Sequence, residues 1–318
     1  MSWKKALLPI AVMASLAFAG AAQAQVNVMI PAGPGGGWDG TGRQAMQAMI
    51  DAGIYTGGVN YTNTGGAGGT IGLAEFQNSS TGKPDSLAVF GAITVGAIDM
   101  NGSPIKLSDF RPIARLTTEY DVIAVKADSP YKTLKDFVEA LKANPGGTPV
   151  GGGSAGGVDQ IALALLAQSA GVSTGDLNYI PQTSGAETVT GIVNGTLVAG
   201  LSGISEFKQF AEQGRIRILG ITAPERQEGV DAPTFKEAGY DVEVGNWRGF
   251  LGAPQMPDDN YKMWVDNFKK LSESDPWKKV LATQGWQPDY LGGEEFGTFI
   301  ASETDRIGAI LKDAGLVK

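Results

Sequence analysis

The feature that most constrains this chain is a glycine-rich turn between a short apolar run and a helical pattern, and it occurs twice. The first copy is Val26–Asp39, in which five glycine and proline residues follow Ala32. The second copy is Pro149–Asp159. A loop with few side chains lets another molecule approach the backbone, and the free N–H groups of a helix's first turn attract a negative group. Two such loops predict two lobes that face one anionic ligand.

Strand-like runs alternate with helical patterns through most of the chain, which predicts an α/β fold of βαβ units. We expect strands at 26–30, 57–61, 86–91, 121–126, 178–180, 197–201 and 217–222, and helices at 41–52, 70–77, 134–141, 158–171, 187–194 and 207–213. The carboxyl ends of parallel strands meet at one edge of a sheet, where ligands of open α/β sheets bind. The turns that follow these strands are therefore expected to gather at one site.

Three further turns precede helices, at Asn63–Gly72, Gln182–Glu187 and Ser202–Glu206. The first, which contains Ala67 and Gly68, could form another wall of the site. Ser184 is either the cap of the next helix or a ligand contact. None of the glycine-rich turns ends in the Gly-Lys-Ser/Thr of a nucleotide-binding loop, so a nucleotide site is not expected.

Two residues of the first turn have two interpretations each. Asp39 either stabilises the start of the helix, as a cap or a first-turn acid, or contacts the ligand. Trp38 either packs in the core or forms a shelf for the ligand at the mouth of the site.

The last third of the chain is expected to return to the first lobe. Strand-like runs at 241–244 and 246–254 precede helices at 260–272, 276–283 and 294–314. This order predicts a first lobe of residues 25–123 and 246–318 and a second lobe of residues 124–245. Two crossings between lobes can act as a hinge that closes over a ligand.

The first 24 residues have the pattern of an export signal. Lys4 and Lys5 precede an apolar run, and Ala22-Gln23-Ala24 is a small-x-small cleavage pattern. The chain has no cysteine, so it forms neither a disulfide nor a thioether-linked lipid anchor. No later run approaches the roughly 20 apolar residues of a spanning helix. We expect cleavage after Ala24 and a location in the bacterial periplasm.

The charged and reactive residues exclude several functions. The chain has 33 acidic and 25 basic residues, a balance that argues against binding to nucleic acid. Histidine and cysteine are both absent, which removes Ser-His-Asp and Cys-His nucleophile systems and the common zinc sites. We therefore expect no catalytic residue, no metal and no cofactor.

Several motifs in one order resemble a known family. They are Gly33-Pro34-Gly35-Gly36-Gly37-Trp38-Asp39, Asn63 with Gly66-Ala67-Gly68-Gly69, Phe110 to Arg115, Gly151 to Gly157, and Trp247-Arg248-Gly249. Their order and spacing are similar to those of the solute-binding subunit of tripartite tricarboxylate transporters, the Bug receptors, from about Val26 to the C-terminus.

The resemblance implies a fold, a function and a partner. The fold would be the two-lobed type II periplasmic binding-protein fold, in which each lobe is a mostly parallel sheet flanked by helices and the ligand lies in the cleft. The function would be to capture a carboxylate, with citrate or another tricarboxylate as first choice before dicarboxylates and aromatic acids. The partners would be this ligand and the membrane permease subunits, and we expect a monomer.

In that family, main-chain N–H groups of the two lobe loops hold the ligand's carboxylate. By position these loops are Gly35 to Trp38 and Ser154 to Gly157. The residues expected at the ligand, with those of the neighbouring turns, are Gly35, Gly36, Gly37, Trp38, Asp39, Ala67, Gly68, Ser154, Ala155, Gly156, Gly157, Asp159, Ser184, Gly185, Ser202 and Trp247.

Two positions depart from the family pattern. Where many members have a small hydroxyl residue after the triple glycine, this chain has Trp38. Where many have a histidine near the start of the second-loop helix, it has Asp159. An acid beside a carboxylate repels it unless it points away, so Asp159 argues against a highly charged ligand.

Other functions for the same cleft remain open. The protein could report its ligand to a membrane kinase, or it could be an enzyme acting on a carboxylate or phosphate ester, with Ser154, a lysine, a tyrosine or a carboxylate as the reactive group. Arg43 and Arg248 are candidate partners for a distal ligand group, and both could instead form structural ion pairs.

Overall fold

The structure is a computed structural model that describes residues 25–317. Its strands are β1 (Val26–Ile30), β2 (Val59–Asn63), β3 (Ser86–Gly91), β4 (Arg111–Lys126), β5 (Val150–Gly152), β6 (Tyr179–Pro181), β7 (Ala199–Gly203), β8 (Ile216–Ile221), β9 (Gly245–Gly252) and β10 (Gln287–Gly292). Its helices are α1 (Gly37–Asp51), α2 (Thr70–Ser80), α3 (Ala92–Met100), α4 (Leu134–Ala143), α5 (Val158–Ser169), α6 (Gly185–Asn194), α7 (Ile204–Glu212), α8 (Asp258–Glu273), α9 (Asp275–Gln284) and α10 (Gly293–Asp313). The expected export signal at residues 1–24 lies outside the described residues.

The strands follow the order β2-β1-β3-β9-β4-β7-β5-β6, and β10 and β8 also pair with β4. The outer strands β2, β1 and β3 of the first lobe are parallel, as are β6, β5 and β7 of the second lobe. The expected two-lobed α/β fold is confirmed. The strands at the centre form antiparallel pairs. Strand β4 is antiparallel to β7 where it enters the second lobe, and β9 is antiparallel to β3 where the chain re-enters the first lobe. Strands β4 and β9 are also antiparallel to each other.

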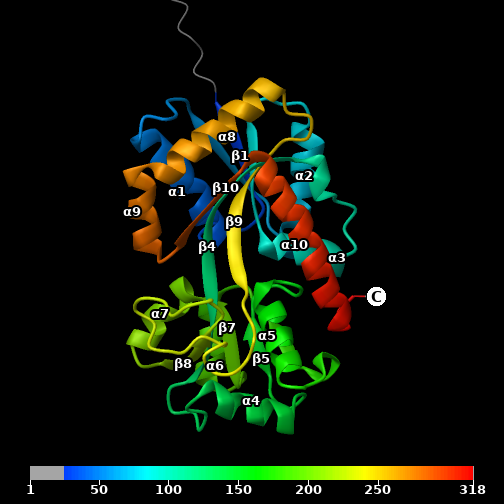
Figure 1. The fold of residues 1–318 in the computed structure, drawn as a ribbon, viewed down its shortest axis with the longest axis vertical. Helices are drawn as coiled ribbons and strands as arrows, with labels where there is room; N and C mark the ends of the chain where they lie inside the picture. The colour runs from blue at the N-terminus through cyan, green and yellow to red at the C-terminus, as the bar shows by residue number, and fades with distance from the viewer. Residues whose placement is uncertain (1–24, 318) are drawn as a thin grey trace, which may run out of the picture.

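Strand β4 connects the two lobes. It pairs with β9 from Arg111 to Tyr120 and with β7 from Asp121 onward. Figure 1 shows β4 and β9 side by side between the upper and the lower lobe. The residue bounds predicted for the lobes stay a prediction, and the change of pairing partner lies between Tyr120 and Asp121.

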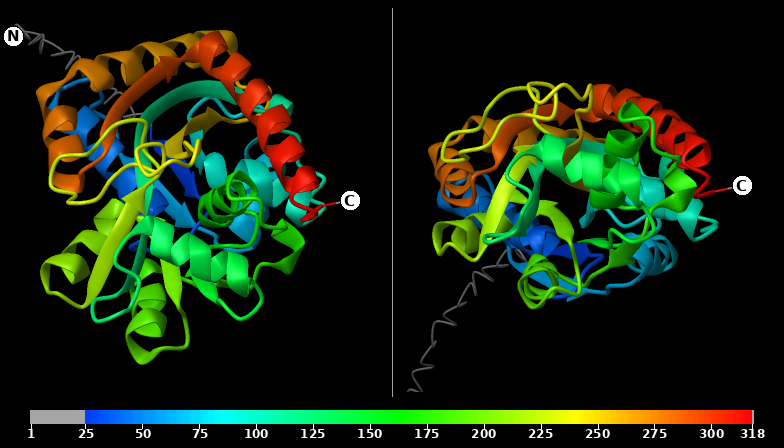
Figure 2. Two further views of the ribbon diagram at one scale, coloured as in Figure 1. Left: turned by 60° about the horizontal axis from the view of Figure 1, so that its bottom comes forward. Right: turned by 90° about the horizontal axis from the view of Figure 1, so that it is seen from below.

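Three groups of buried side chains stabilise this arrangement. One lies under α1, α8 and α9 in the first lobe, where the rings of Phe250 and Phe268 are 4.6 Å apart. A second fills the space between α6, α7 and β8. The third contains residues of both lobes, such as Phe296 of α10 and Leu163 of α5. Figures 1 and 2 show the C-terminal end of α10 reaching toward α5, and the lobes are therefore packed together on this side.

The structure differs from the expected elements at several places, and the strand expected at 241–244 is wrong, because these residues form no strand. Helix α1 begins at Gly37, four residues before the expected start, so that Trp38 and Asp39 belong to its first turn. Helix α3 and strand β10 were not predicted. Strand β4 also begins at Arg111, well before the expected Asp121, and its first half pairs with β9 and β10.

Candidate functional site

A cavity of about 600 Å³ lies where loops of both lobes meet. Its first-lobe wall comes from residues 31–33, 35–38 and 65–69 and from Asn246, Arg248 and Trp286. Its second-lobe wall comes from Gly153, Ser154, Asp159 and residues 182–185, 202–203 and 205–206. The two glycine-rich turns therefore contribute to one cavity.

The first turn presents the N-terminus of α1 to the cavity. The N-cap residue Gly36 has no side chain to satisfy the first N–H groups of the helix, and Gly35 has φ +89°, a conformation that favours glycine. Gly37 and Trp38 follow in the first turn, and both line the cavity. This helix end can receive an anion from the cavity.

Asp39 holds the first turn in place through hydrogen bonds and does not line the cavity. Its carboxylate accepts hydrogen bonds from the Gly35 N–H at 3.0 Å, from Arg43 Nε at 2.8 Å and from Asn63 Nδ2 at 2.9 Å. Partial burial raises the pKa of Asp39, but these three hydrogen bonds outweigh it and keep the pKa below its ordinary value. Asp39 is buried and is not part of the cavity lining, so its role here is to hold the loop.

The third glycine-rich turn packs against Trp38. Gly66, Ala67, Gly68 and Gly69 all have positive φ, and a Cβ at Gly69 would lie 2.6 Å from Cζ3 of Trp38. Ala67 and Gly68 line the cavity. Trp38 is 6% exposed, so it packs in the core as one interpretation expected. It also forms part of the cavity wall, where it could serve as the expected shelf for a ligand.

The second turn is tied down by its own side chains. The Gly153 N–H donates to Asp159 Oδ2, and Tyr179 Oη donates to the Gly153 carbonyl oxygen at 2.9 Å. The Gly156 N–H donates to Gln160 at 2.8 Å. Ser154 and Asp159 line the cavity, whereas Ala155, Gly156 and Gly157 do not.

Gly156 and Gly157 of the expected second loop pack toward α3 instead, and Ala155 is exposed. A Cβ at Gly96 of α3 would lie 2.2 Å from the carbonyl oxygen of Gly156, and a Cβ at Gly156 would lie 2.3 Å from Met100 Cγ. This close packing of a first-lobe helix on the second-lobe loop turns Gly156 away from the cavity. The Gly156 N–H is also occupied by Gln160 and is not free for a ligand.

A buried acid, Asp121, and a partly buried acid, Asp159, meet at the second-lobe wall. Asp121 is fully buried, and neither of its carboxyl oxygens has a donor among the described residues, while its side chain lies within hydrogen-bonding reach of Asp159. Burial raises the pKa of Asp121 well above its ordinary value, and the charge of Asp159 adds to the shift. Burial also raises the pKa of Asp159, partly opposed by hydrogen bonds from Asp121 and Gly153. The raised pKa values favour a proton on this pair, and a proton there would limit the negative charge that Asp159 brings to the cavity.

An ion pair lies at the base of the cavity between β9 and β4. Arg248 Nη2 donates to Glu119 Oε2 at 2.6 Å, and both side chains are buried. Glu119 Oε1 accepts hydrogen bonds from the Ser205 N–H at 2.8 Å and from the Ser205 hydroxyl. Glu119 therefore links Arg248 to the N-terminus of α7 in the second lobe.

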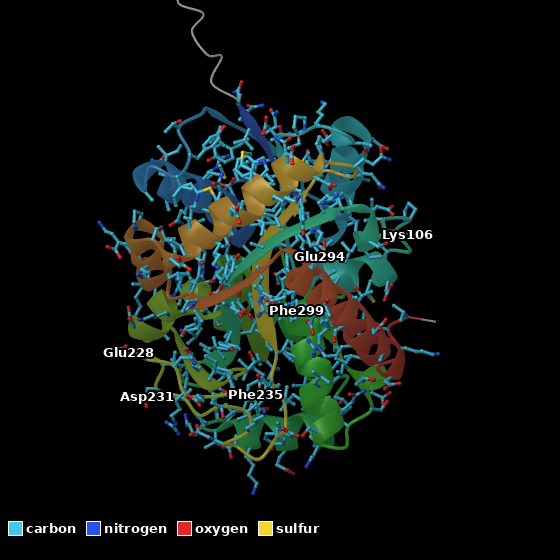
Figure 3. The ribbon with its side chains drawn as sticks, turned by 45° about the horizontal axis from the view of Figure 1, so that its top comes forward. Lys106, Glu228, Asp231, Phe235, Glu294 and Phe299 are labelled. Atoms are coloured by element: carbon cyan, nitrogen blue, oxygen red, sulfur yellow. The ribbon has the colours of Figure 1, made fainter. Side chains whose placement is uncertain are left out.

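Trp247 lies in the core instead of at the cavity. Its ring is 5.1 Å from Phe90 and 5.3 Å from Phe299, which Figure 3 labels on α10, and its Nε1 donates to Glu303 at 3.1 Å. Successive residues of a strand point to opposite faces. Arg248 thus lines the cavity while Trp247 is buried in the core on the other face of β9.

The turns at Ser184 and Ser202 complete the second-lobe wall. Ser184 caps α6, because its hydroxyl oxygen accepts a hydrogen bond from the Glu187 N–H at 3.3 Å, and it also lines the cavity. Ser202 donates to Glu206, and Gly185 packs against both. The expected cap is confirmed, and this cap uses Ser184 Oγ only as an acceptor.

The structure thus brings most expected residues together. The cavity is lined by Gly35, Gly36, Gly37, Trp38, Ala67, Gly68, Ser154, Asp159, Ser184, Gly185 and Ser202, but not by Asp39, Ala155, Gly156, Gly157 or Trp247. Sequence reasoning missed several cavity residues, among them Gln44, Gln182, Ser205, Glu206, Asn246, Gln284 and Trp286. Glu206 could have been predicted as a cavity residue, because it is an acidic residue in a turn that follows a buried strand.

Residues 25–317 contain neither a cluster of metal-binding side chains nor a membrane-spanning helix. They contain no group of three or more acidic side chains placed to hold a metal ion. None of their helices is both long enough and apolar enough to cross a membrane.

Comparison with known proteins identifies the family. The sequence model described as the tripartite tricarboxylate transporter family receptor matches residues 43–316. A UPF0065 protein from the gbd 5′ region of Cupriavidus necator is 27% identical over 223 residues, which are 69% of this chain and 65% of that relative, slightly less than two thirds of its length. A UPF0065 protein of Bordetella pertussis is 23% identical over 307 residues, 92% of this chain and 90% of the relative.

Solved structures share the fold. A solute-binding protein of this family from Polaromonas, solved without ligand, has a TM-score of 0.71 and 25% identity, and the match covers 91% of this chain and 98% of that chain. MatC of Rhodopseudomonas palustris, solved with bound malate, has a TM-score of 0.76 at 20% identity and coverages of 90% and 98%. Another R. palustris protein, solved with adipate, has a TM-score of 0.81 at 18% identity and coverages of 92% and 98%. The chain belongs to the receptor family of tripartite tricarboxylate transporters and is a solute-binding protein of that family.

Proposed function

We propose that this protein binds a small organic acid in the cavity between its lobes and delivers it, in the periplasm, to the membrane permease subunits of a tripartite transporter. The observation that carries this proposal is the N-terminus of α1. Its N-cap residue Gly36 has no side-chain cap, and it lines the same cavity as Ser154 of the second lobe. Uncharged N–H donors and a helix end suit a carboxylate, and each charge-assisted hydrogen bond contributes about 1.5–3 kcal/mol.

Citrate or another tricarboxylate is the first ligand that we propose, in keeping with the family. A dicarboxylate is the second, because two proteins of the same fold were solved with malate and with adipate. A cavity of about 600 Å³ has room for any of the three. We propose binding without catalysis, since the cavity wall consists mainly of glycine, hydroxyl and amide groups.

A thermal-shift screen tests the proposal. The purified protein is melted with citrate, malate, adipate, benzoate and, as a different class, glucose 6-phosphate. An acid present at ~100 times its dissociation constant adds ~2.7 kcal/mol to the free energy of unfolding, which raises the melting temperature by several degrees. The proposal would be wrong if none of the organic acids raised the melting temperature and the phosphate ester were hydrolysed.

Substitution of Ser154 by Asp tests the place of binding. Ser154→Asp puts a negative charge on the second-lobe wall, so we expect the binding of any acid found in the screen to be lost, as measured by titration calorimetry. The matched control is Ser302→Asp at an exposed position of α10, which should leave the dissociation constant unchanged. Equal binding by the two variants would place the ligand elsewhere.

A further inference from the structure

One buried arginine of the cavity has unused hydrogen-bond donors. The side chain of Arg248 on β9 is 7% exposed and lines the cavity. Its Nη2 is engaged by Glu119, but Nε and Nη1 have no partner among the described residues. Leaving a buried charged donor unpaired is costly, and a guanidinium presents its N–H groups in a fork that matches a carboxylate.

The guanidinium lies directly beside the N-terminus of α1. A Cβ at Gly37, the first residue of that helix, would lie 2.9 Å from Arg248 Cζ. The ring of Trp286 is 5.3 Å from the same atom and flanks the guanidinium. A positive charge and the N–H end of a 15-residue helix therefore meet at one part of the wall. Both favour a negative group in the same position.

Arg43, the other candidate arginine, already has side-chain partners. The Arg43 side chain is 45% exposed and is already paired with Asp39 and Asn63, and its guanidinium lies 4.6 Å from the centre of the Tyr61 ring. Arg43 is not part of the cavity lining. It supports the first turn from outside and has no free face toward a ligand in the cavity.

We infer that Arg248 is the charged ligand contact of this receptor, and that its guanidinium donates to a carboxylate of the bound acid while Glu119 holds it in place. This inference rests on the proposed function. It assigns the ligand's anionic group to the first-lobe wall, beside the N-terminus of α1. The second-lobe wall, with Asp159 and Glu206, then faces the remainder of the ligand.

Titration calorimetry with citrate, malate and adipate tests the inference on the wild type and two variants. Arg248→Lys keeps a positive charge for Glu119 but loses the fork. The double variant Glu119→Gln with Arg248→Gln removes both buried charges together, so that neither is left unpaired. We expect at least an about ten-fold loss of affinity in each, because charge-assisted hydrogen bonds to the acid are lost.

A matched control separates affinity from stability. Arg217 of β8 is another partly buried arginine, whose guanidinium donates to the carbonyl oxygens of Ala127 and Tyr131 away from the cavity. Arg217→Gln should lower the melting temperature without changing the dissociation constant. Thermal melts show which variants fold, and if one Arg248 variant does not melt cooperatively the other decides.

The outcomes distinguish this inference from the proposed function. If none of the organic acids of the thermal-shift screen binds to the wild type and the phosphate ester is hydrolysed, the proposed function fails and the inference with it. If the wild type binds an acid and the folded Arg248 variants bind it within two-fold of the wild type, the inference alone is wrong. A loss of affinity confined to the Arg248 variants supports the inference.

Discussion

The chemistry of the cavity depends on a few residues with tightly limited surroundings. Gly37 is one of them, because the guanidinium of Arg248 occupies the space that a side chain at this position would need. Arg248 cannot move away freely, since Glu119 holds it at 2.6 Å. Residue 37 must therefore lack a side chain so that the Arg248 guanidinium fits beside it, and not only so that the chain can turn.

Substitution of Gly37 by Ala tests this requirement. We expect Gly37→Ala to reduce the free energy of unfolding by about 1–3 kcal/mol, because overpacking displaces the buried ion pair. The control is Gly33→Ala in the same turn, where a Cβ would have no atom within 4 Å and φ is not positive, so its stability should change by less than about 0.5 kcal/mol. Chemical denaturation measures both. Equal stabilities of the two variants would contradict the assigned role of Gly37.

We expect the pair of Asp121 and Asp159 to make the stability of the protein depend on pH in an unusual direction. The folded pKa values of Asp121 and Asp159 are both raised, so the pair stabilises the fold fully below the unfolded pKa, and this contribution is lost as the pH rises through the folded pKa. Glu119 adds negative charge nearby, and Arg248 opposes it. A pKa difference of one unit corresponds to about 1.4 kcal/mol.

Asp121→Asn isolates that contribution, because the amide donates to Asp159 without a second negative charge. We expect the stability of the variant relative to the wild type to increase from pH 4 to pH 8, as measured by urea denaturation at several pH values. Groups such as Asp39, whose lowered pKa gives the opposite slope, are common to both proteins and cancel in the difference. Parallel pH profiles would show that the two carboxyls do not share a proton.

At the level of elements, the sequence predicted most helices and strands but not their ends at the site. Apolar periodicity located α4 and α8 well, because each buries one face. It could not place the start of α1, since Gly37 is a poor helix former and its helical geometry is imposed by packing under Arg248 and by the contacts of Asp39. The apolar run at 92–100 has no clear period because α3 is buried on several sides, and β10 is short and polar.

The cavity was predictable where it depends on the backbone and not where it depends on long-range pairing. The two glycine-rich turns and the turns at Ser184 and Ser202 carry local signals. Glu119 and Arg248 are brought together by the register of β4 against β9, which spans more than a hundred residues of sequence and cannot be read from local patterns. The burial of Trp247 likewise follows from which face of β9 meets α10.

A comparison of two helix caps can distinguish a capping residue from a residue that also contacts the ligand. Thr133 caps α4 in a capping box with Asp136, and Ser184 caps α6 at the cavity. We expect Thr133→Ala and Ser184→Ala each to reduce stability by about 1 kcal/mol, within the range known for N-caps. Only Ser184→Ala should also weaken acid binding, because the Ser184 hydroxyl can donate to a carboxylate. Unchanged affinity in calorimetry would leave Ser184 as a cap alone.

At the level of the whole molecule, the lobes are joined by more than the two crossing strands. Buried side chains of α10 and α5 belong to one continuous group, and Gly96 of α3 contacts Gly156 of the second loop. The approach of the lobes on this side is therefore limited by two glycine backbones. A side chain at either position would act as a spacer between the lobes.

Gly96→Ala tests this spacing. A Cβ there would lie 2.2 Å from the carbonyl oxygen of Gly156, whereas alanine favours the helix itself by about 1 kcal/mol. We expect the lobes to move apart, with a larger radius of gyration in small-angle X-ray scattering and a several-fold loss of acid affinity. The control is Gly308→Ala in α10, where the nearest atom is the carboxylate end of Asp99 at 3.2 Å. The spacing argument would be wrong if Gly96→Ala matched that control in both measurements.

The two tryptophans of the cavity wall have a practical consequence. Trp38 and Trp286 both line the cavity, and their indole N–H groups are buried without partners among the described residues. The fluorescence of an indole responds to the charges and the water around it, and the arrival of an acid beside Arg248 changes both. The protein thus carries its own optical reporter, and a change in emission on mixing can follow the capture of an acid in real time without an attached dye.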